Sequence, residues 1–151
     1  KVRPYLRDFF NKVSPIYELI IFTASTAPYA KAVVSHIDPE RKFINFILTR
    51  EHCMETKNGF FIKDLRILKN RDLKDIIIVD NLVHSFGFQI ENGVPILEFL
   101  DDKNDQELRY LADYLLRGHH ISDIRDYNRE KLRLLEMAQK KFEDIESEIK
   151  Y

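Results

Sequence analysis

The chain has 151 residues, of which 44% are apolar and 32% are charged, and its formal net charge at pH 7 is −1. This composition is typical of one globular domain that buries a core, and the balanced charge gives no sign of nucleic-acid binding through bulk electrostatics. No apolar run is long enough to span a membrane. The single cysteine, Cys53, excludes an internal disulfide framework and fits a reducing compartment.

Helical and strand patterns alternate along the chain. Apolar residues at helical spacing predict helices over 5–13, 27–37 and 105–116. Short apolar runs predict strands over 17–22, 43–48, 60–62, 75–79 and 94–97. This alternation predicts an α/β fold with a parallel sheet flanked by helices. The region 43–62, which contains the turn sequence Asn58-Gly59, is interpreted as a small β insertion in that sheet.

The C-terminal stretch has a different character. Residues 128–151 contain no Gly or Pro and are dense in charges of both signs, which predicts a charged amphipathic helix following a domain over 1–127. Its apolar residues follow steps of three and four and form a short heptad seam of Leu135, Ala138, Phe142, Ile145 and Ile149. Two uses of the seam are open: packing on the chain's own domain, or pairing with a partner helix, which includes self-association.

The apolar run Ile20–Phe22 ends in the small residues Thr23, Ala24 and Ser25, and a helical stretch follows. In an open parallel sheet the carboxyl ends of the strands form the crevice where ligands bind. A hydroxyl there, beside the free N–H groups of a helix start, is well placed to hold an oxyanion such as phosphate. The stretch therefore predicts part of an anion site.

A second strand end carries Asp80 and Asn81, after the strongest buried strand of the chain. Carboxylate and amide oxygens at a strand end are natural ligands for Mg²⁺, although a strand-ending Asx turn explains them equally well. Lys63, after the hairpin, and Arg50 carry charges that suit a phosphate, but each alone is more simply a solvated surface residue.

Several other site types are excluded by the sequence. The four glycines are not clustered, so no phosphate-binding P-loop is present. One cysteine cannot build the usual zinc spacing, and the five histidines form no catalytic or metal-binding set. Cys53 has no activating neighbours in sequence and is interpreted as a structural thiol.

Taken together, Thr23, Lys63 and Asp80-Asn81 resemble motifs II, III and IV of the haloacid dehalogenase superfamily. The strings "RPYLRDFF", "YELIIFTAS", "NGFFIKDL" and "RDLKDIIIVDN" resemble one branch more closely, the FCP/SCP-type protein phosphatases, also called NIF-like or CTD phosphatases. The resemblance runs from about Lys1 to Arg125. It implies a Rossmann-like haloacid dehalogenase fold with a β-hairpin insertion, dependence on Mg²⁺, and hydrolysis of phosphoserine or phosphothreonine in proteins.

The resemblance also implies roles for individual residues. Thr23 would bond a phosphate oxygen, and Lys63 would neutralise the phosphate and the nucleophile. Asn81 would complete the Mg²⁺ shell, and Asp80 would orient Lys63 or a water on the metal. These are the catalytic and metal-binding residues that the resemblance assigns to this chain.

Substrate contacts are assigned in the same way to Ala24, Ser25 and Arg50. The family often continues motif IV with Ser-Pro, whereas Leu82-Val83 stand here. The implied partner is a phosphoprotein, with the RNA polymerase II C-terminal tail as one candidate, in the nucleus or the cytoplasm. Direct contact with nucleic acid is not expected, and contact with a membrane is expected only through segments outside this chain.

One element of the family pattern is absent. The nucleophile and the acid/base of the family lie in an Asp-x-Asp-x-Thr/Val motif on its central strand, and the 151 residues contain no Asp-x-Asp. In the implied mechanism an aspartate attacks phosphorus and the aspartyl-phosphate is then hydrolysed. We therefore expect this strand upstream of Lys1, with its place in the sheet between the strands that read YELIIF and DIIIVD. We expect residues 1–151 alone to be inactive and unstable.

Three interpretations are compatible with the sequence. The chain is the larger part of an active phosphatase, or a phosphatase-like scaffold that lost its nucleophile, as in the mitochondrial import receptor Tim50, or an interaction module that uses its C-terminal helix. The first is favoured because Thr23, Lys63, Asp80 and Asn81 are all present.

Overall fold

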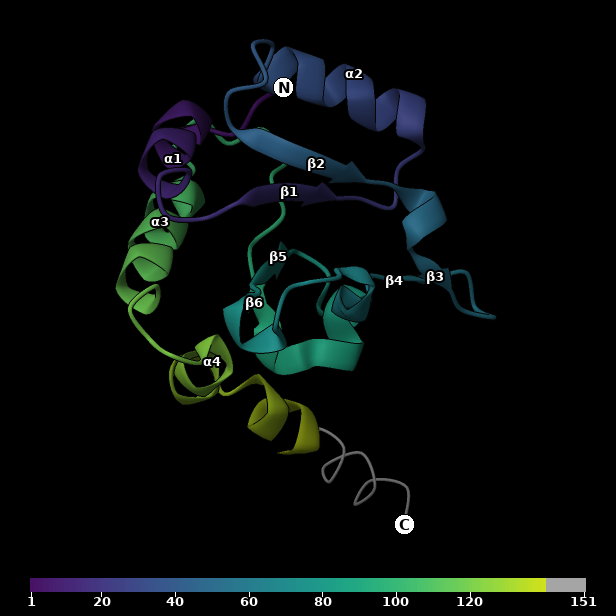
Figure 1. Ribbon diagram of the computed structural model, residues 1–151, viewed down its shortest axis with the longest axis vertical. Coiled ribbons are helices and arrows are strands. Elements are labelled where there is room, and N and C mark those ends of the chain that lie inside the picture. The colour runs from purple at the N-terminus through teal and green to yellow at the C-terminus, as the bar shows by residue number, and fades with distance from the viewer. Residues whose placement is uncertain (141–151) are drawn as a thin grey trace.

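The computed structural model describes residues 1–140 (Figure 1). Its α-helices are α1 (Leu6–Val13), α2 (Ala27–Ile37), α3 (Glu107–Gly118) and α4 (Ile124–Leu132). Its strands are β1 (Leu19–Phe22), β2 (Ile44–Leu48), β3 (Met54–Glu55), β4 (Phe61–Ile62), β5 (Ile78–Asp80) and β6 (Gly93–Pro95). Four 3-10 segments join them: η1 (Arg50–His52), η2 (Leu65–Ile67), η3 (Leu73–Asp75) and η4 (Val83–Asn92). Among these residues no helix has the length and apolar character needed to cross a bilayer.

The strands form three pairs rather than one sheet. β1 pairs in parallel with β2, β5 pairs in parallel with β6, and β3 pairs with β4 as an antiparallel hairpin. The parallel α/β character predicted from the sequence is confirmed. One part of that prediction is wrong, because β2 was placed in the insertion and instead belongs to the parallel layer beside β1, where Phe22 lies opposite Leu48. The insertion is therefore only the hairpin β3–β4.

The hairpin turn has the conformation that its sequence indicates. Gly59 has a φ of 79°, in the left-handed region that glycine adopts without steric cost. The N–H of Thr56 donates to the carbonyl of Phe60 at 2.8 Å, and the N–H of Gly59 donates to the carbonyl of Thr56 at 2.9 Å. The turn leads β4 directly toward Lys63.

The helices divide the core into separate apolar clusters. One cluster joins α1 to α3 and β6 through Val13, Leu111 and Val94, and a second joins α1, α2 and β2 through Phe10, Val34 and Ile44. In Figure 1, α1 and α3 stand side by side at one end of the strands, and α2 lies along β2.

A third cluster lies under β5 and fixes the segment after it. Phe86 of η4 is fully buried against Ile78 and Leu65. A Cβ at Gly93 would stand 2.1 Å from the Phe86 ring, so only glycine permits this approach. The packing holds η4 against β6 and thereby positions the residues that follow Asp80.

β1 and β5 each have only one neighbouring strand among residues 1–140. Successive strand residues direct their backbone groups to opposite edges. The N–H of Thr23 bonds Leu48 of β2, so the peptide groups of Ile20 and Phe22 face the other edge. The carbonyl of Asp80 accepts the N–H of Ile96, so Val79 faces the other edge of β5.

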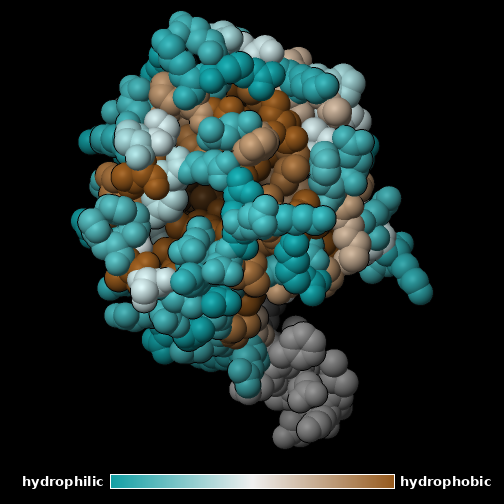
Figure 2. All heavy atoms as spheres, in the orientation of Figure 1, coloured by the Kyte–Doolittle hydropathy of each residue, from teal (hydrophilic) through white to brown (hydrophobic). Residues whose placement is uncertain are grey.

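Burial agrees with these open edges. All four residues of β1 are only half-buried, although a continuous apolar run is expected to be covered on both faces. Figure 2 shows apolar side chains gathered around a hollow in one face of the molecule, over the region between β1, α3 and β5. The two parallel pairs therefore do not close into one continuous sheet within the described residues.

The predicted C-terminal helix is divided at Arg133. α4 ends at Leu132, Arg133 adopts a left-handed φ of 53°, and the backbone is helical again over 134–140. Of the predicted seam, Leu135 is exposed, and Phe142, Ile145 and Ile149 lie outside the described residues.

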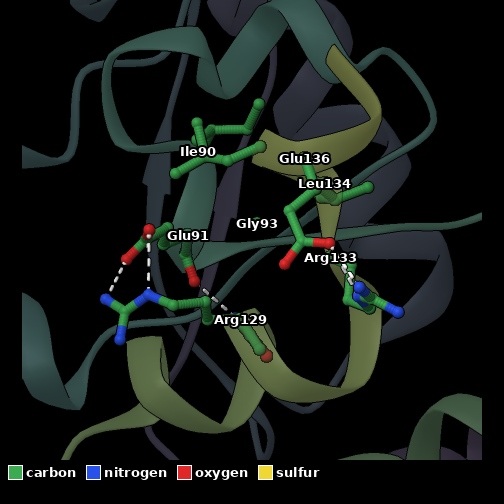
Figure 3. A pocket seen from close by; sticks show the side chains of 9 residues that line it. Ile90, Glu91, Gly93, Arg129, Arg133, Leu134 and Glu136 are labelled. Carbon is green, nitrogen blue, oxygen red and sulfur yellow. Dashed lines mark hydrogen bonds and ion pairs between the residues drawn. The ribbon is translucent and has the colours of Figure 1, made fainter. Parts of the chain in front are cut away.

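The predicted boundary between residues 127 and 128 lies inside α4. The side chain of Asn128 is buried, accepts a hydrogen bond from Tyr114 at 2.7 Å and donates to the carbonyl of Glu91 at 2.8 Å. A small pocket lies where α4 meets η4, and its charged side chains are already paired, Arg129 with Glu91 and Arg133 with Glu136 (Figure 3). It contains none of the predicted site residues.

Candidate active site

The turn after β1 is held by short-range hydrogen bonds. The hydroxyl oxygen of Thr23 accepts the N–H of Ser25 at 3.0 Å, which leaves the hydroxyl hydrogen available for another acceptor. α2 begins after Thr26, whose side chain makes no cap bond, so the first N–H groups of the helix are not satisfied by it. A hydroxyl donor and a helix start therefore lie together, as the sequence predicted.

Arg50 is tied to the same turn. Its backbone N–H donates to the carbonyl of Ser25 at 3.0 Å, and its Nε donates to the carbonyl of Ala24 at 2.8 Å. Its guanidinium carbon lies 5.3 Å from the centre of the Phe61 ring, which adds a cation–π contact. The side chain of Arg50 is thus anchored through Nε, and its two terminal nitrogens have no hydrogen-bond partner among residues 1–140.

The second half of the site is a buried ion pair. The ammonium of Lys63 pairs with one carboxylate oxygen of Asp80, and their side chains are 12% and 6% exposed. The other oxygen of Asp80 accepts the N–H of Leu82 at 2.8 Å, so the predicted Asx turn is present together with the ion pair. The N–H of Lys63 donates to the carbonyl of Ser85 at 2.7 Å. Asp80 and the carbonyl of Ser85 therefore hold Lys63 at the end of β5.

Cys53 lies between the two halves. Its Sγ is 3.7 Å from the carbonyl oxygen of Thr23 and 3.8 Å from that of Thr49. Burial raises the pKa of this thiol, and the charges of Lys63, Asp80 and Arg50 all act on it. The raised pKa keeps Cys53 protonated at neutral pH, consistent with a structural thiol.

A further support for Lys63 was not identified from the sequence. The buried amide of Gln89 accepts the N–H of Leu65 at 3.0 Å and donates to the carboxylate of Asp64 at 2.9 Å. Arg66 binds the same carboxylate, and this pairing holds the pKa of Asp64 well below its usual range. The residues directly after Lys63 are therefore fixed to η4.

Metal ligands are only partly supplied by the described residues. Asn81 is exposed beside Asp80, but both oxygens of Asp80 are engaged, one by Lys63 and one by Leu82. No group of three or more His, Cys, Asp or Glu side chains among residues 1–140 is arranged to hold a metal ion. One amide oxygen does not make a magnesium site, so residues 1–140 alone do not fit this ion.

The predicted residues thus gather in two groups around Cys53. Thr23, Ala24, Ser25 and Arg50 form one group at the end of β1, and Lys63 and Asp80 form the other at the end of β5. Both groups lie at the carboxyl ends of parallel strands, where ligands of open α/β sheets bind. Between them the two groups carry a hydroxyl donor, two cations and a helix start.

Comparison with known proteins shows which family this chain belongs to. The family model of NLI interacting factor-like phosphatases matches residues 1–125. CTD small phosphatase-like protein 2 of Dictyostelium discoideum is 42% identical over 91% of this chain and 24% of its own length. The mitochondrial import inner membrane translocase subunit TIM50 of Kluyveromyces lactis is 38% identical over 82% of this chain and 25% of its own length.

The solved structure of Fcp1, described as an essential RNA polymerase II CTD phosphatase, superposes with a TM-score of 0.66 and covers 92% of this chain and 50% of that one. At 22% identity this likeness concerns the fold alone, and it agrees with the Rossmann-like α/β fold predicted from the sequence. The chain spans about a quarter of the length of these two curated relatives. The resemblance found in the sequence is confirmed, and the chain belongs to the family of NLI interacting factor-like phosphatases.

Proposed function

We propose that the chain is the larger part of a Mg²⁺-dependent protein serine/threonine phosphatase domain that acts through an aspartyl-phosphate, with the nucleophile on a strand outside these residues. The observation that carries this proposal is the buried pair of Lys63 and Asp80 facing the Thr23 turn across Cys53. A lysine ammonium has three N–H donors, so its contact with one carboxylate leaves donors for an incoming phosphate.

The open edges of β1 and β5 support an additional strand between them. A parallel strand inserted there would satisfy the backbone groups of Phe22 and Val79 and would cover the half-buried face of β1. Its carboxyl end would emerge between Thr23 and Asp80. An Asp-x-Asp motif at that end would bring one carboxylate to the phosphate and add the ligands that Asn81 lacks for Mg²⁺.

The residues of this chain would then act on the phosphoryl group by binding and charge compensation. The nucleophilic aspartate forms a bond to phosphorus as the serine or threonine oxygen leaves with a proton from the second aspartate, and water then cleaves the acyl phosphate. Thr23 donates its hydroxyl hydrogen to a phosphoryl oxygen, and Lys63 offsets the charge of the nucleophile and the phosphate. Arg50 and the turn 24–25 contact the substrate.

The substrate would be a phosphoprotein. Fcp1 is described as a phosphatase of the RNA polymerase II C-terminal tail, and we propose the same class of extended, phosphorylated segment here. A phosphatase of this kind would work in the nucleus or the cytoplasm, without direct contact with nucleic acid.

The test uses the full-length protein, that is, these residues together with the upstream segment. We expect hydrolysis of a phosphoserine peptide that requires Mg²⁺, and a loss of about 100-fold in kcat for Lys63→Ala. Lys69→Ala is the matched control, because Lys69 is exposed and lies outside the site. Residues 1–151 alone should neither hydrolyse the peptide nor give a stable monomer. Peptide hydrolysis by these residues alone would contradict the proposed strand.

A second candidate is a phosphatase-like binding scaffold, because TIM50 relatives match nearly as much of this chain. A scaffold would bind partners without turnover. Retention of a phosphopeptide by the full-length protein over hours, with Mg²⁺ present and no phosphate released, would favour it over the phosphatase.

A further inference from the structure

Three large apolar side chains are exposed beside the Lys63–Asp80 pair. Phe60 is 51% exposed, Leu82 is 49% exposed and Val83 is 40% exposed. The ring of Phe60 lies 4.9 Å from that of His84, at an interplanar angle of 59°. We call Phe60, Leu82, Val83 and His84 the apolar rim.

The rim is built into the site by hydrogen bonds. The N–H of Leu82 bonds Asp80 at 2.8 Å, and the N–H of Lys63 bonds the carbonyl of Ser85, next to His84, at 2.7 Å. Phe60 directly precedes β4, which leads into Lys63, and its carbonyl accepts the N–H of Thr56 across the hairpin turn. The rim therefore keeps a fixed position relative to the ion pair.

The rim differs from an ordinary scatter of exposed apolar residues. Single exposed apolar side chains are common on proteins. Here they occupy two elements distant in sequence, joined by the contact of Phe60 with His84, and they border a site whose own side chains are charged.

The chemistry of the rim selects one kind of occupant. A phosphate at Lys63 brings with it the residues on either side of the phosphorylated serine or threonine. The surface offered to these neighbours is apolar and is formed by Leu82, Val83 and Phe60. A charged neighbour would lose hydration there without gaining a hydrogen bond or an ion pair. A large aliphatic or aromatic neighbour would gain from burial.

We propose that the apolar rim binds a large apolar side chain of the substrate, close to the phosphorylated residue, and so selects phosphoprotein segments that carry Leu, Ile, Met or Phe there. This inference rests on the proposed function, because it takes the phosphate to sit at Lys63. It adds a specificity-determining surface made of Phe60, Leu82, Val83 and His84.

The experiment measures kcat/KM and, separately, peptide affinity by fluorescence anisotropy, using the full-length protein. The phosphoserine peptides differ at one position at a time. Each of the two residues before the phosphoserine and each of the two residues after it is either Leu or Ser. We expect Leu at one position to improve both quantities about tenfold over Ser, the order of magnitude found for a hydrophobic pocket that discriminates side chains.

The variant L82S/V83S removes the apolar surface and keeps the Leu82 N–H that bonds Asp80. We expect it to reduce the preference for Leu peptides over Ser peptides, in kcat/KM and in affinity, to less than about twofold. The control is Val33→Ser on α2, because Val33 is 40% exposed, the same as Val83, and lies outside the rim.

Each result has a definite meaning. The rim is overturned as a specificity surface if the wild-type protein shows equal kcat/KM and affinity for Leu and Ser peptides. It is also overturned if L82S/V83S retains the preference for Leu. A dimer that L82S/V83S converts to a monomer in sedimentation also overturns it, because the rim would then bind a second copy. A Leu preference in affinity without any hydrolysis supports the rim and contradicts the proposed phosphatase activity, so the two ideas fail separately.

Discussion

The two halves of the candidate site are stabilised in different ways. The Thr23 half is half-buried and is held by hydrogen bonds without an ion pair, from the N–H of Ser25 to Thr23 and from Arg50 to the carbonyls of Ser25 and Ala24. The Lys63 half is a buried ion pair whose members are almost fully withdrawn from water. A buried charge depends strongly on its partner, whereas a half-buried turn without an ion pair loses less when one hydrogen bond is removed. The halves should therefore respond very differently to substitution.

Removal of Asp80 should have the largest effect. Asp80→Ala leaves the ammonium of Lys63 buried without a partner, so we expect a loss of about 3–5 kcal/mol in the free energy of unfolding. Denaturant unfolding of the full-length protein measures this loss.

The double variant K63M/D80N distinguishes two causes of lost stability: a charge left buried without a partner, and the absence of the ion pair itself. It removes both charges and keeps an acceptor for the N–H of Leu82. We expect it to be more stable than Asp80→Ala, since the cost of a broken buried pair comes mainly from the charge left behind. If K63M/D80N were as unstable as Asp80→Ala, the ion pair itself would be the source of stability.

Gln89→Ala tests the network that supports the Lys63 half. The substitution leaves the buried N–H of Leu65 without its acceptor, and we expect a loss of about 1–3 kcal/mol in the free energy of unfolding. Amide hydrogen exchange should be faster at Leu65 and Lys63 than at residues of α3. Phe88→Ala, at an exposed position of η4, is the control and should change stability by less than about 1 kcal/mol.

The pH dependence of stability tests how Asp38 supports the Thr23 half of the site. Burial would raise the pKa of this carboxyl, but N–H groups of Ile44, Phe43 and Lys42 donate to it and hold its pKa below the ordinary value. These bonds fix the start of β2, which leads to Arg50 at its other end.

A carboxyl whose pKa is lower in the folded protein contributes stability above its unfolded pKa, and the contribution is lost as the pH falls through the folded value. We therefore expect Asp38→Asn to lower Tm at pH 7, with the difference from the wild type shrinking below about pH 4. Thermal unfolding at pH 7, 5, 4 and 3 follows this. A constant difference across the series would mean that the charge of Asp38 is not what β2 requires.

Local signals in the sequence predicted much of the fold. The helix over 27–37 has the predicted bounds, because Pro28 near its start and Asp38-Pro39 at its end act on neighbouring residues only. The partner of β2 was mistaken because strand pairing depends on residues far apart in the chain. The end of α4 at Arg133 was also missed, since a left-handed arginine replaces the glycine that usually marks such an end.

In the candidate site, too, some residues were predicted from the sequence and others were found only in the structure. Lys63 and Asp80 were identified because their motifs resemble a known family, and the structure pairs them. Gln89 was not identified, because its contacts with Asp64 and Leu65 depend on the path of η4, and a lone glutamine carries no signal in the sequence. The apolar rim combines residues from the hairpin and η4, which only the packing of Phe60 on His84 brings together.

Thr23→Ala should have the smallest effect on stability. The substitution removes one hydrogen bond, from the N–H of Ser25 to a half-buried hydroxyl, and water can replace it, so we expect a loss of about 1 kcal/mol or less in the free energy of unfolding. Thr23→Ser keeps the hydroxyl and should cost less still. If the hydroxyl also binds phosphate, inorganic phosphate should protect the wild type and Thr23→Ser against thermal unfolding more than it protects Thr23→Ala. A loss for Thr23→Ala as large as that for Asp80→Ala would mean that the two halves are not stabilised differently, and that the turn after β1 is as tightly coupled to the core as the buried ion pair.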